Sequence, residues 1–542
     1  MSRLLIAIAL LAALLPASAR QLAREFRLDV ASSDGQGLPP SNGIGQIRIE
    51  GTTFWIGTSK GVARSRDFGH TWQSFRTNPA FANDGIFAMD SRGDTVWAST
   101  GFDTEIAGGD KIQTGSGYGR TTDGGVTWKH VAQPVDTCIQ LPSSGNKKCQ
   151  NFLPIPYGVN TGLTLSAVTT KVSNVSYDVS LTPQTVWVAS WAGGLRKSTN
   201  DGQTWERIPL PLDNMNSISD RDTLWYFRDT DTLRQDTLYP VFDVVANDNL
   251  KAFGVHSEDG ITVWCGTAGG INRSTDGGRS WTRFTNKNQV SHMLSNWVYR
   301  IAEQHFGSVD RIWATNWRTN KDIDQPEDYG VSFTDDQGRT WTNALRGVKA
   351  YNFAFRGSVA YITSDQGLYR TSDGGASFDN VSNIYDASSR QVIATSQFVS
   401  VGTFGDTVYV GSDDGFASTV DNGTEPFGKT WDVSRSYAPV GASATTYAYP
   451  NPFSPGFEPV RIHYGTQGAA PTAHLTVDID IFDFGMNRVK ILVHGADRSG
   501  SEFDELWDGR DETGKVVPNG TYFYRLKVQD HDPQYGKILV LQ

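Results

Sequence analysis

The chain has 542 residues, including 56 glycines and 16 tryptophans, and a formal net charge of −10 at pH 7. This composition is typical of a turn-rich all-β protein. The acidic balance, with no basic stripe, excludes the electrostatic attraction to phosphate on which nucleic-acid binding depends, so we expect no nucleic-acid partner.

Residues 1–19 have the pattern of a secretory signal peptide. Arg3 precedes an apolar run from Leu4 to Leu15, and the small residues Ala17-Ser18-Ala19 follow. The alternative, a membrane anchor, needs about 20 apolar residues, and this run is shorter and meets Pro16. No other stretch is apolar enough to span a bilayer. We therefore expect an exported chain, secreted or on the outer cell surface, with no transmembrane segment after cleavage.

A short motif recurs along the chain from residue 65 to residue 431. In the copy at residues 274–281 (STDGGRSW), the aspartate can bond nearby backbone N–H groups, a glycine can take positive φ, and the tryptophan can be buried under a hairpin. The motif therefore predicts a rigid corner between two strands. The third positions of the seven copies are Asp67, Asp123, Asn200, Asp276, Asp336, Asp373 and Asp421, the last in a damaged copy whose Thr430-Trp431 is displaced by a short insertion.

An apolar run centred on an aromatic residue precedes each copy, as in Phe54–Thr58 and Val263–Thr267. With the alternating run before it and a strand on each side of the motif, every repeat supplies four short antiparallel strands. The irregular period, upward from about 37 residues, indicates a repeat architecture with loop insertions. We predict an all-β fold with a seven-bladed β-propeller over residues 24–436, because ring closure leaves only short, protected edges.

The Ser/Thr-x-Asp-x-Gly-x-Thr-Trp signature resembles the Asp box of the BNR propellers, a group that includes sialidases, xyloglucan-cleaving hydrolases, sortilin-type receptors and a photosystem assembly factor. The resemblance covers roughly residues 40–440. It implies that each box lies on the turn between the third and fourth strands, on the face away from the active site. The seven box residues are accordingly expected to be structural.

Four insertions interrupt the repeats, at about residues 100–118, 131–172, 209–250 and 316–329. Two of them connect one blade to the next and two join a second strand to a third, so in a propeller all four emerge on the face opposite the boxes. We expect this face to bind the ligand. Phe102, Trp191 and Trp317 lie at the ends of second strands there, where they either stack on sugar rings or hold peptide side chains, or are covered by a neighbouring insertion.

The cysteines and the acidic residues of the insertions give no metal motif. In an exported chain we expect a disulfide between Cys138 and Cys149, whereas Cys265, inside a strand, is predicted to be a buried thiol. The aspartates between Asp220 and Asp236 could bind calcium, but their spacing does not match an EF-hand loop, which favours a solvated acidic loop. We expect no metal and no cofactor.

A glycoside hydrolase, sialidase-like or xyloglucanase-like, is the alternative function. A sialidase needs an arginine cluster, and Arg300 is the only well-placed arginine on a predicted inner strand, since residues 207–209 (RIP) follow the third box on an outer strand. Xyloglucanase-like inversion needs two carboxylates about 6.5–9.5 Å apart. The sequence selects no pair among the candidates Asp84, Asp103, Glu105, Asp243, Asp322 and Asp324.

The box periodicity ends after Trp431, and residues 437–445 read as a linker. Residues 449–453 (YPNPF), 506–511 (LWDGRD) and 519–526 (NGTYFYRL) resemble the Ig-like module of the flagellar hook-capping protein FlgD and the C-terminal sorting domains of type IX secretion. We predict that residues 446–542 form an Ig-like β-sandwich that folds separately from the propeller. Its expected role is export, attachment or spacing, with secretion machinery as a partner.

The expected function is that of a secreted or cell-surface bacterial protein whose propeller recognises an extracellular glycan or protein through the insertion-bearing face. Binding is favoured over catalysis because no catalytic constellation can be assembled from the residues named above.

Overall fold

The computed structural model describes residues 37–542 except 82–83, 106–108, 138–151, 161–162, 225, 229–235, 239–240, 320–326, 390, 437–445, 456–457, 466–473 and 500–501. In this part of the chain the regular structure is strand, apart from two short 3-10 helices, η2 (Pro79–Phe81) and η3 (Asp248–Leu250). The predicted all-β class is confirmed. The predicted signal peptide, Cys138, Cys149 and the predicted linker lie outside the described residues.

Residues 44–74 form the first of a series of four-stranded antiparallel meanders, in which each strand pairs with the next one along the chain. The second strand of the meander is mostly apolar, because every residue of it except the first is buried. The strands of this first meander are β1 (Ile44–Glu50), β2 (Thr53–Thr58), β3 (Gly61–Ser65) and β4 (Gln73–Ser74).

The same meander recurs along the chain as far as residue 434. The strands, in chain order, are β5 (Gly85–Arg92), β6 (Thr95–Glu105), β7 (Lys111–Thr121) and β8 (Lys129–Val131); β11 (Ser176–Leu181), β12 (Val186–Ser190), β13 (Gly194–Ser198) and β14 (Glu206–Ile208); β19 (Ala252–His256), β20 (Val263–Thr267), β21 (Gly270–Ser274) and β22 (Ser280–Phe284); β23 (Trp297–Phe306), β24 (Val309–Trp317), β25 (Gly330–Thr334) and β26 (Thr342–Ala344); β27 (Ala350–Arg356), β28 (Val359–Ser364), β29 (Gly367–Thr371) and β30 (Asp379–Val381); and β33 (Phe398–Phe404), β34 (Thr407–Ser412), β35 (Gly415–Val420) and β36 (Asp432–Ser434).

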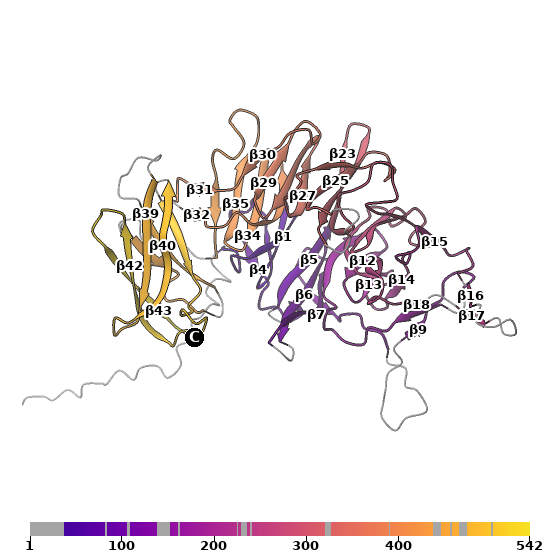
Figure 1. Ribbon diagram of the computed structural model, residues 1–542, viewed down its shortest axis with the longest axis horizontal. Coiled ribbons are helices and arrows are strands. Elements are labelled where there is room, and N and C mark those ends of the chain that lie inside the picture. Colours follow the sequence, from indigo (N-terminus) through magenta and orange to yellow (C-terminus); the bar gives the residue numbers. More distant parts are fainter. Residues whose placement is uncertain are drawn as a thin grey trace, which may run out of the picture.

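The first strands of the meanders form a closed ring. Figure 1 shows the meanders packed beside one another, with the C-terminal part of the chain in yellow next to them. Each first strand contacts the first strand of the next meander, in the order β1, β5, β11, β19, β23, β27 and β33, and β33 contacts β1. Radial four-stranded sheets that close in this way are typical of a β-propeller, which protects its sheet edges by closure.

The aromatic residues of the second strands fill the space between neighbouring meanders. The box glycines approach these rings so closely that a Cβ on Gly125 would lie 2.9 Å from Trp55, and one on Gly278 would lie 2.9 Å from Trp187. Both glycines also have positive φ, so no other residue fits without strain. The buried second-strand aromatics are Trp55, Trp97, Trp187, Trp264, Trp313, Tyr361 and Tyr409.

The turns define two faces of the ring. On one face, the box turns touch the turns between first and second strands, as where the Gly277 N–H donates to the Ile261 carbonyl at 2.9 Å. On the other face, the turns between second and third strands touch the starts of first strands, as where the Ser59 N–H donates to the Gly43 carbonyl at 2.9 Å. We call these the box face and the insertion-bearing face.

Further strands come from the connections between meanders. β9 (Phe152–Pro154), β10 (Thr164–Ser166) and β18 (Val241–Phe242) form a three-stranded sheet, so the insertions 131–172 and 209–250 pair with each other. β15 (Ser217–Ser219) pairs with β22 as a fifth strand of the fourth meander. β16 (Tyr226–Arg228) pairs with β17 (Asp236–Leu238), and β31 (Ile384–Asp386) pairs with β32 (Gln391–Ile393).

The C-terminal module consists of two antiparallel sheets around one core. Trp507 and Ile462 from one sheet share this core with Ile479 and Tyr524 from the other. The first sheet contains β37 (Thr446–Tyr449), β38 (Val460–Gly465) and β41 (Glu502–Trp507), and the second contains β40 (Arg488–Ser499), β39 (His474–Phe482), β42 (Gly520–Val528) and β43 (Gln534–Val540) in that order.

The C-terminal module is joined to the ring by buried charges. Asp414, in the turn between β34 and β35, pairs with Arg461 of β38 and with Arg435, whose Nη2 lies 3.1 Å from the same carboxylate. All three side chains are at most 2% exposed. Nearby, the Asn42 amide donates to Glu458 at 3.2 Å. The module therefore contacts the first and last meanders of the ring on the insertion-bearing face.

Among the described residues there is no helix long and apolar enough to cross a membrane.

Candidate functional site

The box residues are bonded within their own turns. Asp123 accepts hydrogen bonds from the Thr127 amide at 2.9 Å, the Thr127 hydroxyl at 2.6 Å and the Thr121 hydroxyl at 2.7 Å. The bonds from the Thr127 hydroxyl and amide lower the pKa of Asp123 to about 2. With their acceptor capacity used locally, these side chains rigidify the turn. The Asn200 side chain accepts from the Thr204 amide but donates to the Thr204 hydroxyl. The pattern of Asp123 occurs at Asp67, Asp276, Asp336 and Asp373.

Asp421 departs from the predicted box role. It is 2% exposed, and its carboxylate accepts bonds from the Tyr361 hydroxyl at 2.5 Å and from Arg370 Nε at 2.6 Å, both on the preceding meander. The insertion at residues 422–430 displaces Thr430, whose carbonyl instead accepts a bond from the Thr419 hydroxyl at 2.6 Å. Asp421 thus ties two neighbouring meanders together rather than closing its own turn.

On the insertion-bearing face, every first strand carries a register shift against its second strand near its start. Such a bulge places one extra residue opposite its partner strand and redirects its side chain. Because the shifts fall at equivalent positions around the ring, the extra residues lie at one end of it. They are Gly45, Phe87, Tyr177, Phe253, Tyr299 with Arg300, Tyr351 and Val399.

Four of the aromatic residues at these bulges, all except Phe87, join two tryptophans to form a continuous row. The Tyr177 and Phe253 rings are 5.2 Å apart between centroids, and Phe253 lies 5.3 Å from Trp297. Trp317 stacks on Tyr299 at 4.3 Å and contacts Tyr351, one meander further on, at 5.9 Å. All but the buried Phe253 are half-buried. We call this set the aromatic row: Tyr177, Phe253, Trp297, Tyr299, Trp317 and Tyr351.

Charged groups flank the row at Tyr351. The Lys349 ammonium lies 4.2 Å from the Trp317 ring centroid and 5.9 Å from that of Tyr351. Burial, together with the carboxylates of Asp365 and Asp413, raises the pKa of Tyr351 to about 12, so the phenol remains a hydrogen-bond donor at neutral pH. This end of the row thus combines ring faces with a cation, a phenol and two carboxylates.

Of the three predicted aromatic residues, only Trp317 belongs to the row, and its indole N–H donates to the Ala350 carbonyl at 2.8 Å. Trp191 is half-buried under the Lys251 ammonium, 5.6 Å from its ring centroid, and Lys251 in turn pairs with Asp248 of an insertion. Phe102 is 47% exposed, and its neighbour Asp103 lies on the opposite side of β6. Asp103 pairs with Gln113 of β7, and Gln113 accepts a bond from the Tyr177 hydroxyl, so the side of β6 with Asp103 faces the row. Phe102 therefore points away from the row. The other five residues of the row were not predicted from the sequence, because the bulges that bring the rings together are visible only in the tertiary structure.

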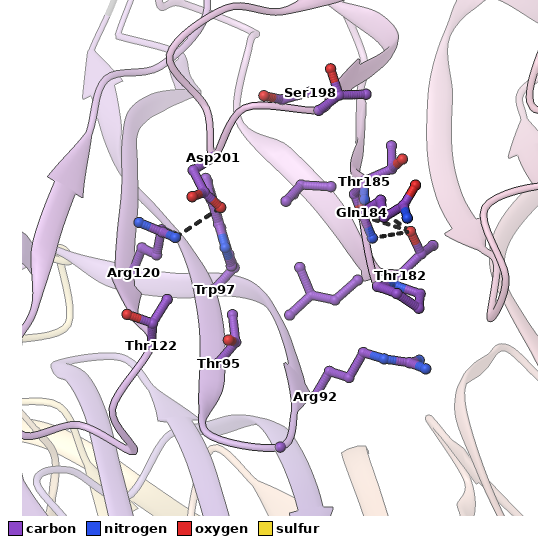
Figure 2. A pocket seen from close by; sticks show the side chains of 15 residues that line it. Arg92, Thr95, Trp97, Arg120, Thr122, Thr182, Gln184, Thr185, Ser198 and Asp201 are labelled. Atoms are coloured by element: carbon purple, nitrogen blue, oxygen red, sulfur yellow. Dashed lines mark hydrogen bonds and ion pairs between the residues drawn. The ribbon is translucent and has the colours of Figure 1, made fainter.

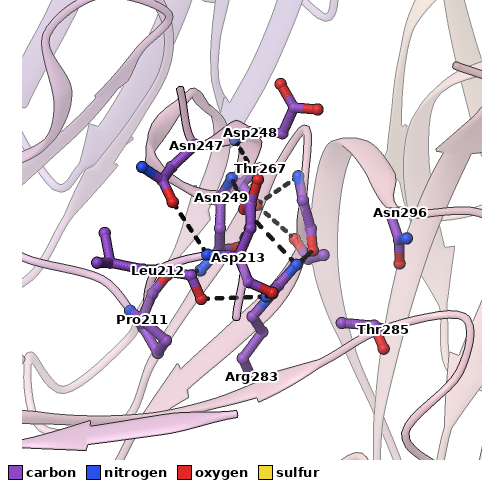
Figure 3. A network of polar contacts seen from close by, with 12 residues as sticks. Pro211, Leu212, Asp213, Asn247, Asp248, Asn249, Thr267, Arg283, Thr285 and Asn296 are labelled. Atoms are coloured by element: carbon purple, nitrogen blue, oxygen red, sulfur yellow. Dashed lines mark hydrogen bonds and ion pairs between the residues drawn. The ribbon is translucent and has the colours of Figure 1, made fainter. Parts of the chain in front are cut away.

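A polar network fixes the 209–250 insertion to this face (Figure 3). Arg283 of β22 is 7% exposed and donates to the carbonyls of Asp213 at 2.7 Å and Gly269 at 2.7 Å. The Asp213 carboxylate accepts from the backbone N–H groups of Asp248 at 2.8 Å and Asn249 at 2.9 Å. Both ends of the insertion are therefore held against the same meander.

The two long connections do not stay on the insertion-bearing face, contrary to the sequence expectation. β15 follows the outer edge of the fourth meander, with Ser219 opposite Ser280 of the box. The Tyr157 hydroxyl donates to the Arg279 carbonyl, also in that box, at 2.8 Å. Apolar residues of both connections share a core with the third and fourth meanders, and this shared burial explains their course along the rim.

Three of the charged residues considered for the hydrolase alternative are bonded to other groups. Arg300 is 4% exposed on β23 and pairs with Asp178, while Arg207 pairs with Asp136 at 2.7 Å. Asp243 accepts bonds from Ser166 and Val245, each at 2.9 Å. Asp84 precedes β5, Asp103 and Glu105 end β6, and Asp322 and Asp324 lie outside the described residues.

A cleft of about 770 Å³ opens between the second and third meanders near their boxes (Figure 2). Arg120 and Asp201 pair across it at 2.8 Å, and threonine and glutamine side chains line much of the rest. No aromatic cluster or pair of carboxylates faces this cleft among its lining residues. The aromatic row is the stronger candidate site.

Cys265 is buried, as predicted, and burial raises the pKa of its thiol.

No protein-family model matches the chain, and no curated protein matches its sequence. YCF48 from Cyanidioschyzon merolae is 16% identical, with 72% of this chain and 98% of that chain covered and a TM-score of 0.40. PorZ, an essential surface component of the type-IX secretion system of Porphyromonas gingivalis, is 12% identical, with 91% and 64% covered and a TM-score of 0.33. An ancestral GH74 enzyme is 15% identical, with 72% and 56% covered and a TM-score of 0.29. At these values the similarities indicate no function for this chain.

Proposed function

We propose that this chain is a secreted or cell-surface binding protein that recognises an extracellular glycan or protein through its insertion-bearing face. The observation that carries the proposal is the aromatic row, in which rings from four neighbouring meanders are in contact on the insertion-bearing face. Half-buried rings offer one face to a ligand while the other is held by packing, so little conformational entropy is lost on binding.

The surroundings of the row favour recognition. Lys349, Asp365 and the Tyr351 hydroxyl supply polar groups beside flat apolar surface, which is the combination that orients a ligand. Arg300 and Arg207 are paired with carboxylates, so neither is available to clamp a substrate carboxylate.

A glycoside hydrolase remains the alternative, and one observation favours it. The carboxylates of Asp365 and Asp413 both act on the Tyr351 phenol, so two carboxylates lie at the same end of the row, and a glycosidase uses such a pair. If the protein is an enzyme, Asp413→Asn abolishes cleavage of a polysaccharide.

We propose further that the ring is a seven-bladed BNR-type propeller and that residues 446–542 form an Ig-like sandwich similar to that of FlgD. The closed order of first strands supports the first assignment, and the two sheets with one core support the second. The signal-peptide pattern at residues 1–19 supports export, and the C-terminal module is assigned to export, attachment or spacing.

The test is a glycan and peptide array probed with the mature chain, residues 20–542, followed by affinity measurements on each ligand found. We expect Tyr351→Ala and Trp317→Phe to weaken binding tenfold or more, because the first removes a ring and the second removes the indole N–H and part of the stacking surface. Phe484→Ala, which removes a 78% exposed ring on the C-terminal module, is the matched control and should leave affinity unchanged.

A turnover screen on the same polymers separates the two functions. Ligand affinity that survives both row substitutions would exclude the row as the binding site. Polysaccharide cleavage that Asp413→Asn abolishes would instead establish the hydrolase.

A further inference from the structure

Five ionisable side chains gather on the box face, at the opposite end of the ring from the aromatic row. They come from β19 and the turn after it, and from β23 and β24 of the next meander. Neither the box turns nor the aromatic row uses them. The members are His256, Glu258, Glu303, His305 and Asp310.

Three of these side chains have the geometry of a metal site. His256 Nε2 lies 3.1 Å from Glu303 Oε2, and one ligand atom from each of His256, Glu258 and Glu303 lies within 4.8 Å of the other two. Zinc bonds to imidazole nitrogen and carboxylate oxygen are about 2.0–2.2 Å long, so the donors of a tetrahedral site are separated by about 3.3–3.6 Å. A small shift of side chains therefore brings all three donors onto one ion.

The fold holds these donors in place. His256 and Glu258 are two residues apart along one chain segment, and Glu303 lies on the first strand of the adjacent meander, which contacts β19. The side chains of His256 and Glu303 are 22% and 18% exposed, so packing restricts them, while Glu258 is exposed and leaves a path for an ion. Preorganised donors lower the entropic cost of binding an ion.

The remaining two residues support the site from outside. His305 Nε2 lies 3.1 Å from Glu258 Oε1, and His305 Nδ1 lies 2.7 Å from Asp310 Oδ1. Because carboxylates hold both nitrogens of the His305 imidazole, His305 orients Glu258. We do not count His305 among the metal ligands. Outer partners of this kind tune metal sites. Arg92 approaches the Glu258 carbonyl at 3.4 Å, so one cation also faces the cluster.

We propose that His256, Glu258 and Glu303 bind a divalent transition-metal ion of the zinc class, with solvent completing the coordination. One imidazole with carboxylates suits zinc or cobalt, whereas calcium takes oxygen ligands alone. The ion would cross-link the fourth and fifth meanders on the box face. This inference is independent of the proposed ligand recognition on the other face.

The test uses the mature chain without a polyhistidine tag, dialysed against Zn²⁺ and, separately, Co²⁺ and Ca²⁺. We expect one Zn²⁺ per chain, a Co²⁺ visible spectrum of a four- or five-coordinate site, and no Ca²⁺ bound at the same concentration. His256→Ala and Glu258→Gln should each weaken Zn²⁺ binding tenfold or more. Glu258 is exposed, so its substitution leaves the fold intact.

His474→Ala is the matched control, because His474 pairs with Asp497 at 2.9 Å in an exposed two-residue arrangement on the C-terminal module. Its Zn²⁺ binding should equal that of the unaltered chain. The proposal fails if the unaltered chain binds no Zn²⁺, if Glu258→Gln binds it equally well, or if His474→Ala removes the bound ion.

Discussion

Single residues hold the box turns, and Asp276 shows how. It accepts bonds from the Ser274 hydroxyl at 2.8 Å, the Ser280 amide at 2.9 Å and the Ser280 hydroxyl. We expect Asp276→Ala to lower the free energy of unfolding by about 1–2 kcal/mol, because these donors lose their acceptor. Asp276→Asn should cost much less, since Asn200 already makes the equivalent bonds to Thr204. Urea unfolding at pH 7 measures both.

The same residue predicts a pH dependence. Partial burial raises the pKa of Asp276, but the hydrogen bonds from Ser280 outweigh this and lower it below its usual value of 3.8. A lowered folded-state pKa stabilises the fold above the unfolded value, and this contribution is lost as pH falls through the folded value. The stability difference between the unaltered chain and Asp276→Asn should therefore shrink below about pH 4. A difference that is constant down to pH 2 would contradict a role for the carboxylate charge.

At the scale of elements, the connection at residues 209–250 depends on Arg283. Arg283→Ala would leave the buried carbonyls of Leu212 and Gly269, and the partly buried carbonyl of Asp213, without their donor. We expect a loss of about 3 kcal/mol in the free energy of unfolding and faster amide hydrogen exchange at residues 211–216 and 247–250. Arg279→Ala, at an exposed position in the box of the same meander, is the control and should change neither quantity. Exchange that accelerates equally over the whole meander would show that Arg283 is not specific to the connection.

At the scale of the whole molecule, the ring and the C-terminal module are coupled by the Asp414 cluster. Removing one partner of a buried ion pair leaves an uncompensated charge, so Arg461→Ala should cost about 3–5 kcal/mol and separate the unfolding transitions of the two parts. Arg525→Ala, which breaks a partly exposed pair with Asp480 in the same module, should cost less than about 1 kcal/mol. Scanning calorimetry distinguishes these results.

Two independent transitions in the unaltered chain, both insensitive to Arg461→Ala, would support the sequence expectation of a separately folding module. That expectation is based on the motifs of the module, such as NGTYFYRL at residues 519–526. Its alternating Tyr522, Tyr524 and Leu526 describe the core of the module and carry no information about its contact with the ring.

The sequence by itself determined the features whose causes are local. A box bonds residues four apart, as Asp123 bonds Thr127, and a second-strand aromatic such as Trp187 is identified by the apolar run around it. These patterns gave the all-β class, the repeating meander and the buried Cys265. The expectation of no metal did not take account of His256 and Glu258, because the third proposed ligand, Glu303, comes from another meander.

The tertiary structure decided everything that depends on ring closure and register. The bulges that align Tyr177, Phe253 and Tyr299 are register shifts between strands, and no residue pattern in one strand specifies them. Asp421 bonds Tyr361 across 60 positions of sequence, and the insertions follow the rim because their apolar residues share a core with distant strands. Such contacts are set by the burial of surface between segments far apart in the chain, which local composition does not encode.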